Sequence, residues 1–249
     1  MRCAVASAFA IAAACTPGPR VVVPDTVATV TLRLSNVHVV LGGAHPLLVD
    51  TGSPGDADAL ERGLAKLGVK IADVRCAVVT HGHGDHAGGA RALQRRGVRI
   101  IAGSGDLWHE LDGIHGKLRA TSFFARILKV IIPKRYEPFV PDVVIDGPFD
   151  LHECGVDGVV MPAPGHTRGS VVVLIDHGRV ALVGDLFRGG ALAGYVHPWS
   201  PKEHFYQDDP EMAHRRIREL LARGVQIFVL GHGGPAKRDD VERVFGDAR

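Results

Sequence analysis

The run Thr-His-Gly-His-Gly-Asp-His-Ala-Gly-Gly at 80–89 constrains the fold more than any other part of the chain. It places His81, His83, Asp85 and His86 within six residues, immediately after an apolar segment at 76–80 that reads as a strand. Imidazole and carboxylate are the ligands that first-row divalent metals favour, zinc foremost. The two intervening glycines let a tight loop turn these side chains toward one region. Four such groups buried together would stay unsatisfied without a cation, so the run predicts a metal-binding loop rather than a solvated turn.

Three later segments place a histidine or an aspartate just beyond a predicted strand. They are Pro-Gly-His-Thr-Arg-Gly-Ser, Gly-Asp-Leu-Phe and Gly-His-Gly-Gly-Pro, which contain His166, Asp185 and His232 and follow predicted strands at 159–161, 180–183 and 226–230. Layered folds often place sites beyond the carboxyl ends of their strands. In order, flanking glycines and strand context, these segments and 80–89 resemble the metallo-β-lactamase superfamily over roughly residues 27–235.

The resemblance implies a dinuclear centre holding two zinc ions, with iron or manganese as alternatives. One metal would be held by His81, His83 and His166, and the other by Asp85, His86 and His232, with Asp185 bridging the two. A hydroxide between the metals would be the nucleophile, and one metal would polarise the carbonyl or phosphoryl oxygen of the substrate. Asp85 is the candidate catalytic residue, because beside that hydroxide it could accept the proton.

Asp50 matches a family position that hydrogen-bonds a ligand histidine. Capping of the following turn is the alternative interpretation of this residue.

Asp185 discriminates among the branches of the superfamily. In its true β-lactamases the corresponding residue is usually Cys or Ser, whereas Asp resembles the glyoxalase II, lactonase and phosphodiesterase branches. We therefore expect a hydrolase that uses the bridging hydroxide on a small ester, thioester, lactone or amide. A β-lactamase, a phosphodiesterase and an iron-dependent sulfur oxidoreductase are the alternatives, the last because persulfide dioxygenases keep much of the same motif.

Other polar residues near the expected ligands are candidates for substrate contacts. Tyr195 or His197 could donate a hydrogen bond to a developing oxyanion, with loop packing as the alternative. Arg168 and Arg188 could bind a substrate carboxylate, with a plain surface role as the alternative.

The remaining histidines are weaker candidates. Those in or beside strands are expected to be structural or surface residues, and those elsewhere to be solvated: the first group is His38, His152 and His177, and the second is His109, His115, His204 and His214.

Early strands, interleaved helices and later strands predict one α+β or α/β domain over 27–249 with layered sheets. The resemblance makes this a four-layered αβ/βα sandwich, the metallo-β-lactamase fold. Besides those given above, strands are predicted at 27–34, 37–41, 45–50, 98–102, 143–145 and 171–176, and helices at 56–67, 88–96, 210–223 and 239–245.

An insertion at 108–141 departs from this pattern. Read as a helix, its central part has a broad apolar face with Arg126 and Lys129 to one side. It is interpreted either as a helix packed on the core, or as a segment that covers the substrate or faces a membrane.

The first fifteen residues fit a secretory signal peptide, with Arg2 before a small, largely apolar run. Ala-Ala-Ala-Cys at 12–15 resembles a bacterial lipobox, so Cys15 could be lipidated and 16–26 would be a tether. We expect an exported protein, periplasmic or anchored to the membrane as a lipoprotein; a cytoplasmic protein is the alternative.

The amino-acid composition indicates which classes of binding partner to expect. Lys and Arg total 29 against 27 Asp and Glu, a formal charge of +2 that gives no reason to expect nucleic acid. The expected partner is a small-molecule substrate, with contact to a membrane only through the lipid anchor; the sequence does not indicate an oligomeric state. Four cysteines are too few and too scattered for a disulfide scaffold, and Cys76 is expected to be an inert core residue.

Overall fold

The computed structural model describes residues 18–246, apart from 117, 130–131, 192–193 and 195. The signal peptide expected at 1–15, with Cys15, and the first two residues of the expected tether lie outside this part of the chain. Among the described residues, no helix has both the length and the apolar character needed to cross a membrane.

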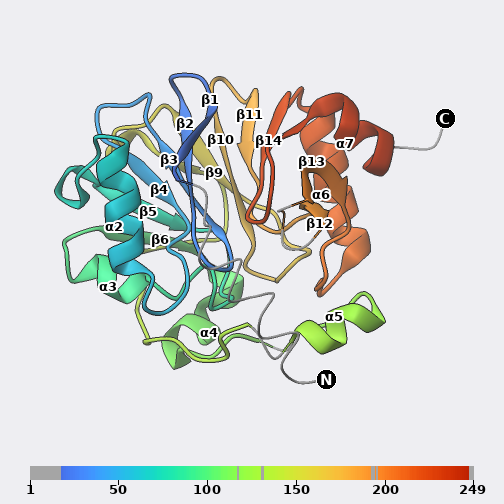
Figure 1. Ribbon diagram of the computed structural model, residues 1–249, viewed down its shortest axis with the longest axis horizontal. Helices are drawn as coiled ribbons and strands as arrows, with labels where there is room; N and C mark the ends of the chain where they lie inside the picture. Colours follow the sequence, from blue (N-terminus) through green and yellow to red (C-terminus); the bar gives the residue numbers. More distant parts are fainter. Residues whose placement is uncertain (1–17, 117, 130–131, 192–193, 195, 247–249) are drawn as a thin grey trace.

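The first half of the chain forms a seven-stranded mixed sheet (Figure 1). Its spatial order follows the sequence: β1 (Arg20–Val23), β2 (Val27–Thr31), β3 (Asn36–Val40), β4 (Leu47–Val49), β5 (Cys76–Val79), β6 (Arg99–Gly103) and β7 (Val143–Ile145). The strands β1 to β4 pair antiparallel, and β4 to β7 pair parallel. The strands β3, β4 and β5 are buried along their whole length, as expected for branched apolar residues in a sheet that is covered on both faces.

The tether expected over 16–26 is wrong from Arg20 onward. Residues 20–23 form β1, which pairs with β2 and places Arg20 opposite Thr29. Val23 is buried in the core between the sheets, so this strand belongs to the folded domain. A four-residue strand beside prolines carries too little pattern to be distinguished from a linker in the sequence.

The second half forms a six-stranded sheet and a separate two-stranded ribbon. In the sheet the spatial order is β15 (Ala236–Lys237), β14 (Ile227–Val229), β11 (Val180–Leu182), β10 (Val171–Ile175), β9 (Gly158–Pro162) and β8 (Phe149–Asp150), and the ribbon is β12 (Arg188–Ala191) with β13 (Val196–Lys202). Four of these strands, β8, β12, β13 and β15, are additions to the predicted set. Two of them have only two residues, and the ribbon carries glycine, proline and charged residues that obscure a strand pattern.

The described helices are α2 (Ala57–Lys66), α3 (Ala90–Gln94), α4 (Leu107–Asp112), α5 (Phe123–Leu128), α6 (Pro210–Ala222) and α7 (Arg238–Phe245), with 3-10 turns at Ile71–Asp73, Ser104–Asp106 and His152–Cys154. Figure 1 shows α2 and α3 beside the first sheet and α6 and α7 beside the second.

Three apolar cores separate the layers. Leu60 and Leu64 of α2 pack against the first sheet, Val49 and Val173 meet between the two sheets, and Ile217 of α6 packs against the second sheet. The expected α+β sandwich of four layers is therefore confirmed.

Local signals explain the ends of the two long helices. Asp209 accepts a hydrogen bond from the Met212 N–H at 2.9 Å, and Pro210 occupies the first helical position, so α6 begins there. The helix α2 ends just before Gly68, whose φ of 74° is in the left-handed region that favours glycine.

The insertion contains two short helices, α4 and α5, rather than one long one. Ala125 of α5 is buried in a small cluster with Leu118 and Tyr206, separate from the three main cores, while Phe123 is 76% exposed. The Tyr206 hydroxyl donates to the Ala125 carbonyl at 2.8 Å. The helix α5 thus packs on the segment around residue 206, and the interpretation as a helix on the main core is wrong.

The end of the insertion lies against the histidine-rich loop. A Cβ at Gly84 would be only 2.4 Å from the Pro133 carbonyl oxygen. The Tyr136 hydroxyl donates to the Gly82 carbonyl at 3.0 Å. This segment therefore covers the loop 80–89.

A disulfide joins Cys76 to Cys154, and both residues are fully buried. Cys76 opens β5 in the first sheet, and Cys154 ends a 3-10 turn beside the second sheet. The expectation of an inert Cys76 is therefore wrong. The partners are 78 residues apart in sequence, and only the packing of the two sheets brings their Cα atoms to 5.6 Å.

Replacing both cysteines by alanine is expected to lower the free energy of unfolding by about 2–5 kcal/mol, because the bridge closes a long loop in the unfolded chain. Urea unfolding of wild type and of Cys76→Ala/Cys154→Ala measures the loss. Wild type unfolded in a reductant is the control, since it loses the bridge and keeps the sulfur atoms. Equal midpoints for oxidised wild type and the double variant would contradict the expectation.

Candidate metal centre

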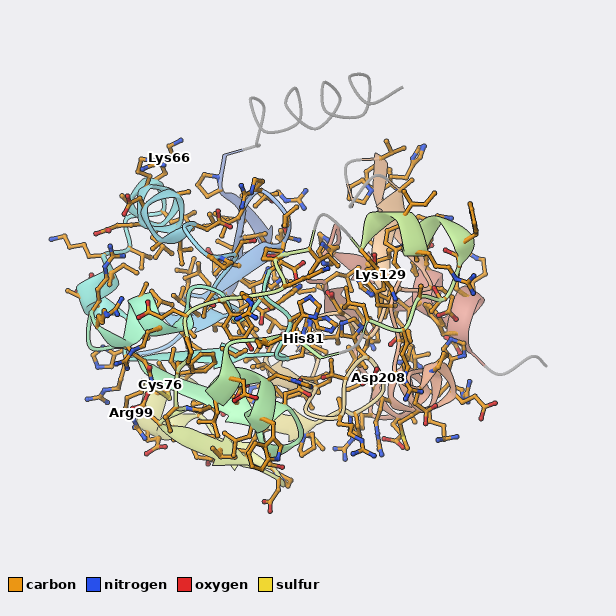
Figure 2. All side chains as sticks on the ribbon, turned by 90° about the horizontal axis from the view of Figure 1, so that it is seen from below. Lys66, Cys76, His81, Arg99, Lys129 and Asp208 are labelled. Atoms are coloured by element: carbon orange, nitrogen blue, oxygen red, sulfur yellow. A yellow bond between two sulfur atoms is a disulfide. The ribbon has the colours of Figure 1, made fainter. Side chains whose placement is uncertain are left out.

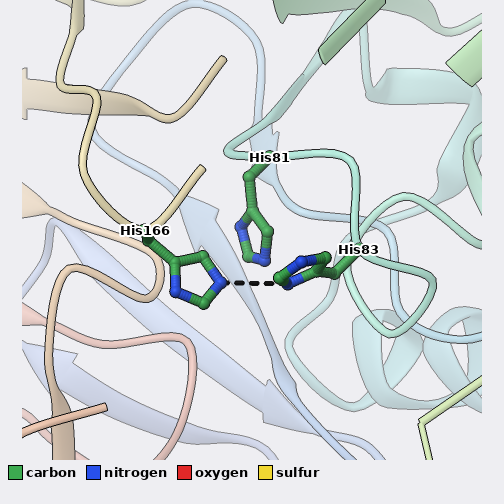
Figure 3. A group of neighbouring side chains, drawn as sticks. All are labelled: His81, His83 and His166. Atoms are coloured by element: carbon green, nitrogen blue, oxygen red, sulfur yellow. Dashed lines mark hydrogen bonds between the residues drawn. The ribbon is translucent and has the colours of Figure 1, made fainter. Parts of the chain in front are cut away.

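The seven residues expected to bind metal lie together, although they come from both sheets. His81, His83, Asp85 and His86 occupy the loop after β5, whereas His166, Asp185 and His232 follow β9, β11 and β14 of the second sheet. Figure 3 shows His166 approaching His81 and His83 from the opposite side, with its Nε2 2.9 Å from the His83 Nδ1. In Figure 2, His81 lies near the middle of the molecule, whereas Lys66 lies at its periphery.

The Oδ2 atom of Asp185 is at the centre of this group. It lies 3.8 Å from the Nε2 of His81, 3.4 Å from that of His86, 3.7 Å from that of His166 and 3.2 Å from that of His232. The Asp85 Oδ2 is 3.5 Å from the His232 Nε2 and 3.7 Å from the His86 Nε2.

The donor atoms form overlapping groups that could each hold a metal ion. Within each group the atoms lie within 4.8 Å of one another: His81, His83 and His166; His81, His86 and Asp185; Asp85, His86 and His232; and His166, Asp185 and His204.

These residues fit a divalent cation on two counts. The His81 Nε2 and the Asp185 Oδ1 are buried without a hydrogen-bond partner among the described residues, which is costly unless a cation neutralises them. Two ligands about 2.1 Å from one tetrahedral ion are about 3.4 Å apart. The separations around the Asp185 Oδ2, 3.2 to 3.8 Å, match that spacing.

Hydrogen bonds on the far side of three rings set which nitrogen faces the centre. The His86 Nδ1 donates to the Asp50 Oδ2 at 2.8 Å, and the His166 Nδ1 donates to the Tyr206 carbonyl at 2.8 Å. The Thr80 hydroxyl donates to Asp50 and accepts from the His81 Nδ1 at 3.0 Å. Each Nε2 then faces Asp185 and is the nitrogen available for metal ligation. Of the two interpretations of Asp50, the partner of a ligand histidine is correct.

Asp106 is a positioning residue that the sequence analysis missed. It is 2% exposed, and its Oδ2 accepts the Gly82 N–H at 2.9 Å and the Thr167 hydroxyl at 2.6 Å. Its Oδ1 accepts the Gly169 N–H at 3.0 Å. One carboxylate therefore ties the loop carrying His81 and His83 to the loop carrying His166. The only indication of Asp106 in the sequence is that it lies shortly after the predicted strand 98–102.

Burial keeps several of the imidazoles neutral. It lowers the pKa of His83 to about 3 and lowers the pKa of His81 and His166 well below the usual value. Neutral imidazole is the form that binds metal.

The carboxylates reverse this effect elsewhere in the centre. Burial by itself would lower the pKa of His86 and His232, but the charge of Asp185 and its neighbours raises both. Burial would raise the pKa of Asp185, and the charges of His232 and His86 outweigh it and hold that pKa well below its usual range. Asp185 is therefore an anion at neutral pH, with a charge that a cation would balance.

Glu110 lies behind this site in α4, and neither of its carboxyl oxygens has a hydrogen-bond partner among the described residues. Burial, aided by the charge of Asp106, raises the pKa of Glu110 to about 8. Glu110 is thus mostly protonated at neutral pH and adds little charge beside Asp106.

The expectation that His204 is solvated is wrong. It is 4% exposed, and its Nε2 lies 3.1 Å from the Asp185 Oδ2. Its ring centroid is 4.6 Å from that of His166, at an interplanar angle of 90°. It precedes α6 in a segment with charged neighbours, which reads as surface in the sequence; the packing of the insertion on this segment buries it.

The other histidines vary in exposure. His38 is buried and structural, with the Thr29 hydroxyl and the Leu230 carbonyl as partners. His152 and His177 are exposed. His109, His115 and His214 are only half-buried, and the His115 ring centroid is 5.8 Å from that of His83.

Three of the four candidates for substrate contact lie in the described part of the chain. Tyr195 lies outside the described residues, and His197 is exposed with its ring against Trp199. Arg168 is exposed. Arg188 is half-buried, and its guanidinium lies 4.0 Å from the centroid of the Phe205 ring, next to His204.

His204→Ala is expected to weaken zinc binding by about 10–100-fold, because its ring contacts the carboxylate oxygen shared by the donor groups. Competition with a chromophoric chelator measures the affinity. His214→Ala is the matched control, since that ring pairs with Glu203 on the outer surface. Wild-type affinity in His204→Ala would show that the contact is incidental.

The comparisons with known proteins identify the family of the chain. A family model described as the metallo-beta-lactamase superfamily matches residues 30–232. Metallo-beta-lactamase domain-containing protein 1 of Xenopus laevis is 29% identical over 200 residues, which cover 79% of this chain and 70% of the relative. The probable metallo-hydrolase YflN of Bacillus subtilis is 24% identical over 229 residues, which cover 82% of this chain and 83% of the relative.

Solved structures show the same fold. BJP-1, a subclass B3 metallo-beta-lactamase of Bradyrhizobium japonicum, aligns with a TM-score of 0.61 and 20% identity, over 87% of this chain and 79% of that one. At this identity the likeness concerns the fold alone. The family match spans well over half of the sequence, and the chain therefore belongs to the metallo-β-lactamase superfamily of metallo-hydrolases.

Proposed function

We propose that this protein is a dinuclear zinc-dependent hydrolase of small esters, thioesters, lactones or amides. The observation that carries the proposal is the position of the Asp185 Oδ2, which lies within 4 Å of imidazoles from both expected metal sites. A carboxylate in that position can bridge two cations, and two-cation sites are typical of hydrolytic enzymes.

The donor groups divide into two sets around Asp185. His81, His83 and His166 form one, and Asp85, His86 and His232 form the other. When bound, two zinc ions would lower the pKa of water and polarise the carbonyl oxygen of the substrate. Each set combines imidazole nitrogens with access to a carboxylate, which suits zinc.

Asp85 is proposed to hold the proton released from the attacking water. Its side chain is 6% exposed, and its Oδ2 faces the His232 and His86 rings. The Ser35 hydroxyl donates to the Asp85 backbone carbonyl and fixes this part of the loop. A carboxylate held in place beside the reacting water is suited to accept a proton and return it to the leaving group.

Asp185→Asn and His83→Ala are expected to lower kcat/KM by roughly 1,000-fold, equivalent to about 4 kcal/mol of lost transition-state stabilisation. A panel of lactones, thioesters, phosphodiesters and β-lactams identifies the substrate, and elemental analysis identifies the metal. Asp176→Asn and His152→Ala are controls, because these side chains lie on the surface away from the centre.

Circular dichroism separates loss of function from loss of fold. Near-wild-type rates in either ligand variant would contradict the ligand assignment. Bound iron with visible absorption in place of about two zinc ions per chain would favour oxidation chemistry instead.

We also propose that the chain is exported and anchored through lipidated Cys15. The buried Cys76–Cys154 disulfide supports export, since such bonds persist in oxidising compartments and are rare in the cytosol. Mass spectrometry of protein made in a bacterial host with its leader intact checks this: we expect a mature chain that starts at a lipid-modified Cys15 and sediments with membranes. An unprocessed chain in the cytosolic fraction would refute export.

A further inference from the structure

A cavity of about 130 Å³ opens beside the candidate metal centre. His232 forms part of its wall, so the cavity adjoins the donor group that also contains Asp85 and His86. The turn between β2 and β3 forms the opposite wall, and Arg20 of β1 lines it as well. A ligand in this cavity would therefore contact His232, one of the expected metal ligands.

The turn is fixed to two of the loops that carry expected ligands. The Asn36 N–H donates to the Gly231 carbonyl at 2.8 Å, and its side-chain amide donates to the carbonyls of Leu230 and Gly233, each at 3.0 Å. The Ser35 hydroxyl donates to the Asp85 carbonyl. These bonds use both hydrogens of the Asn36 amide and hold the wall at a set distance from the centre.

The charges in the cavity are of one sign. Arg20 and Arg33 line it, and none of its lining residues is an aspartate or a glutamate. Among the described residues, neither guanidinium lies within ion-pair distance of a carboxylate. The Arg20 Nη2 donates to the Gly234 carbonyl at 3.0 Å, and its Nε is buried without a hydrogen-bond partner.

A half-buried guanidinium without a carboxylate is an unbalanced charge that favours an anionic ligand. The cavity, of about 130 Å³, has room for a carboxylate group. Arg33 is exposed, so it lies where it can attract an anion from solvent.

We propose that this cavity, bounded by Arg20, Arg33 and His232, binds a carboxylate of the substrate. The preferred substrates are then esters, thioesters, lactones or amides that carry a carboxylate three carbon atoms from the carbonyl under attack. This inference rests on the proposed hydrolase for the identity of the reacting group. The cavity and its charge are independent of that proposal.

The first test compares a matched pair of lactones, γ-butyrolactone and γ-carboxy-γ-butyrolactone. Wild type is expected to prefer the carboxylated lactone in kcat/KM, and Arg20→Gln to reduce that preference by about tenfold, chiefly through KM. Arg20→Lys is expected to restore part of it, because the charge remains and the planar fork does not. Arg179→Gln is the control, since that exposed guanidinium pairs with Asp176 far from the cavity.

The second test needs no turnover. Calorimetric titration of glutarate into the zinc-loaded protein is expected to give a Kd about tenfold weaker in Arg20→Gln than in wild type and in Arg179→Gln. Arg33→Glu, at an exposed position, is expected to weaken binding as well, and it keeps the test decisive if Arg20→Gln does not fold.

Equal glutarate affinity in wild type, Arg20→Gln and Arg33→Glu would overturn the proposal, because the carboxylate would then be held by the metal centre alone. If glutarate binding depends on Arg20 while no substrate in the panel is hydrolysed, the anion site stands and the hydrolase does not.

Discussion

Many ionisable donor groups are buried around one carboxylate, and the rest of the structure has to compensate the cost of burying them. Asp185 is 4% exposed, and imidazoles from four different loops point at it. Without compensation, such a group would cost several kcal/mol per unsatisfied atom. The protein compensates on the outer side of the rings, where Asp50, Thr80 and the Tyr206 carbonyl accept or relay hydrogen bonds. The nitrogen atoms on the inner side of the rings are left for a cation to bind.

The two sheets share the task of supplying these donors. Parallel pairing of β4, β5 and β6 places the end of β5 at the edge where β9, β11 and β14 also end. Since neither sheet holds a full set, the core between the sheets sets the distance across the centre. Asp106 adds a direct link between the facing loops. Rigid elements thus carry the site, and the loops only span short gaps.

Much of this could be predicted from sequence, because the informative signals were local. A strand followed by histidines and glycines identified the donor loop, and short apolar runs rich in β-branched residues identified many of the buried strands. The helix α6 was predicted over 210–223, and its start carries two local signals, Asp209 and Pro210. In each case the residues that specify the element lie within it.

The features that were missed depend on contacts between distant segments. His204 became part of the centre because the insertion buries its segment, and Cys76 acquired a partner because the sheets pack together. Arg20 lies in a strand defined by its pairing with β2 more than by its own residues. Long-range contacts of this kind leave little trace in a single sequence. Local patterns therefore predicted the donor residues but not the residues that pack around them.

The contact between Gly84 and Pro133 links the metal-binding motif to the insertion in a way that neither segment reveals alone. Any side chain at position 84 would collide with the backbone of the covering segment. The second glycine of the motif, Gly84, is therefore required by the position of Pro133 as well as by the turn of the loop. An engineer who grafts a different insertion onto this scaffold changes the residues that position 84 can accept, and the two segments have to be redesigned as one unit.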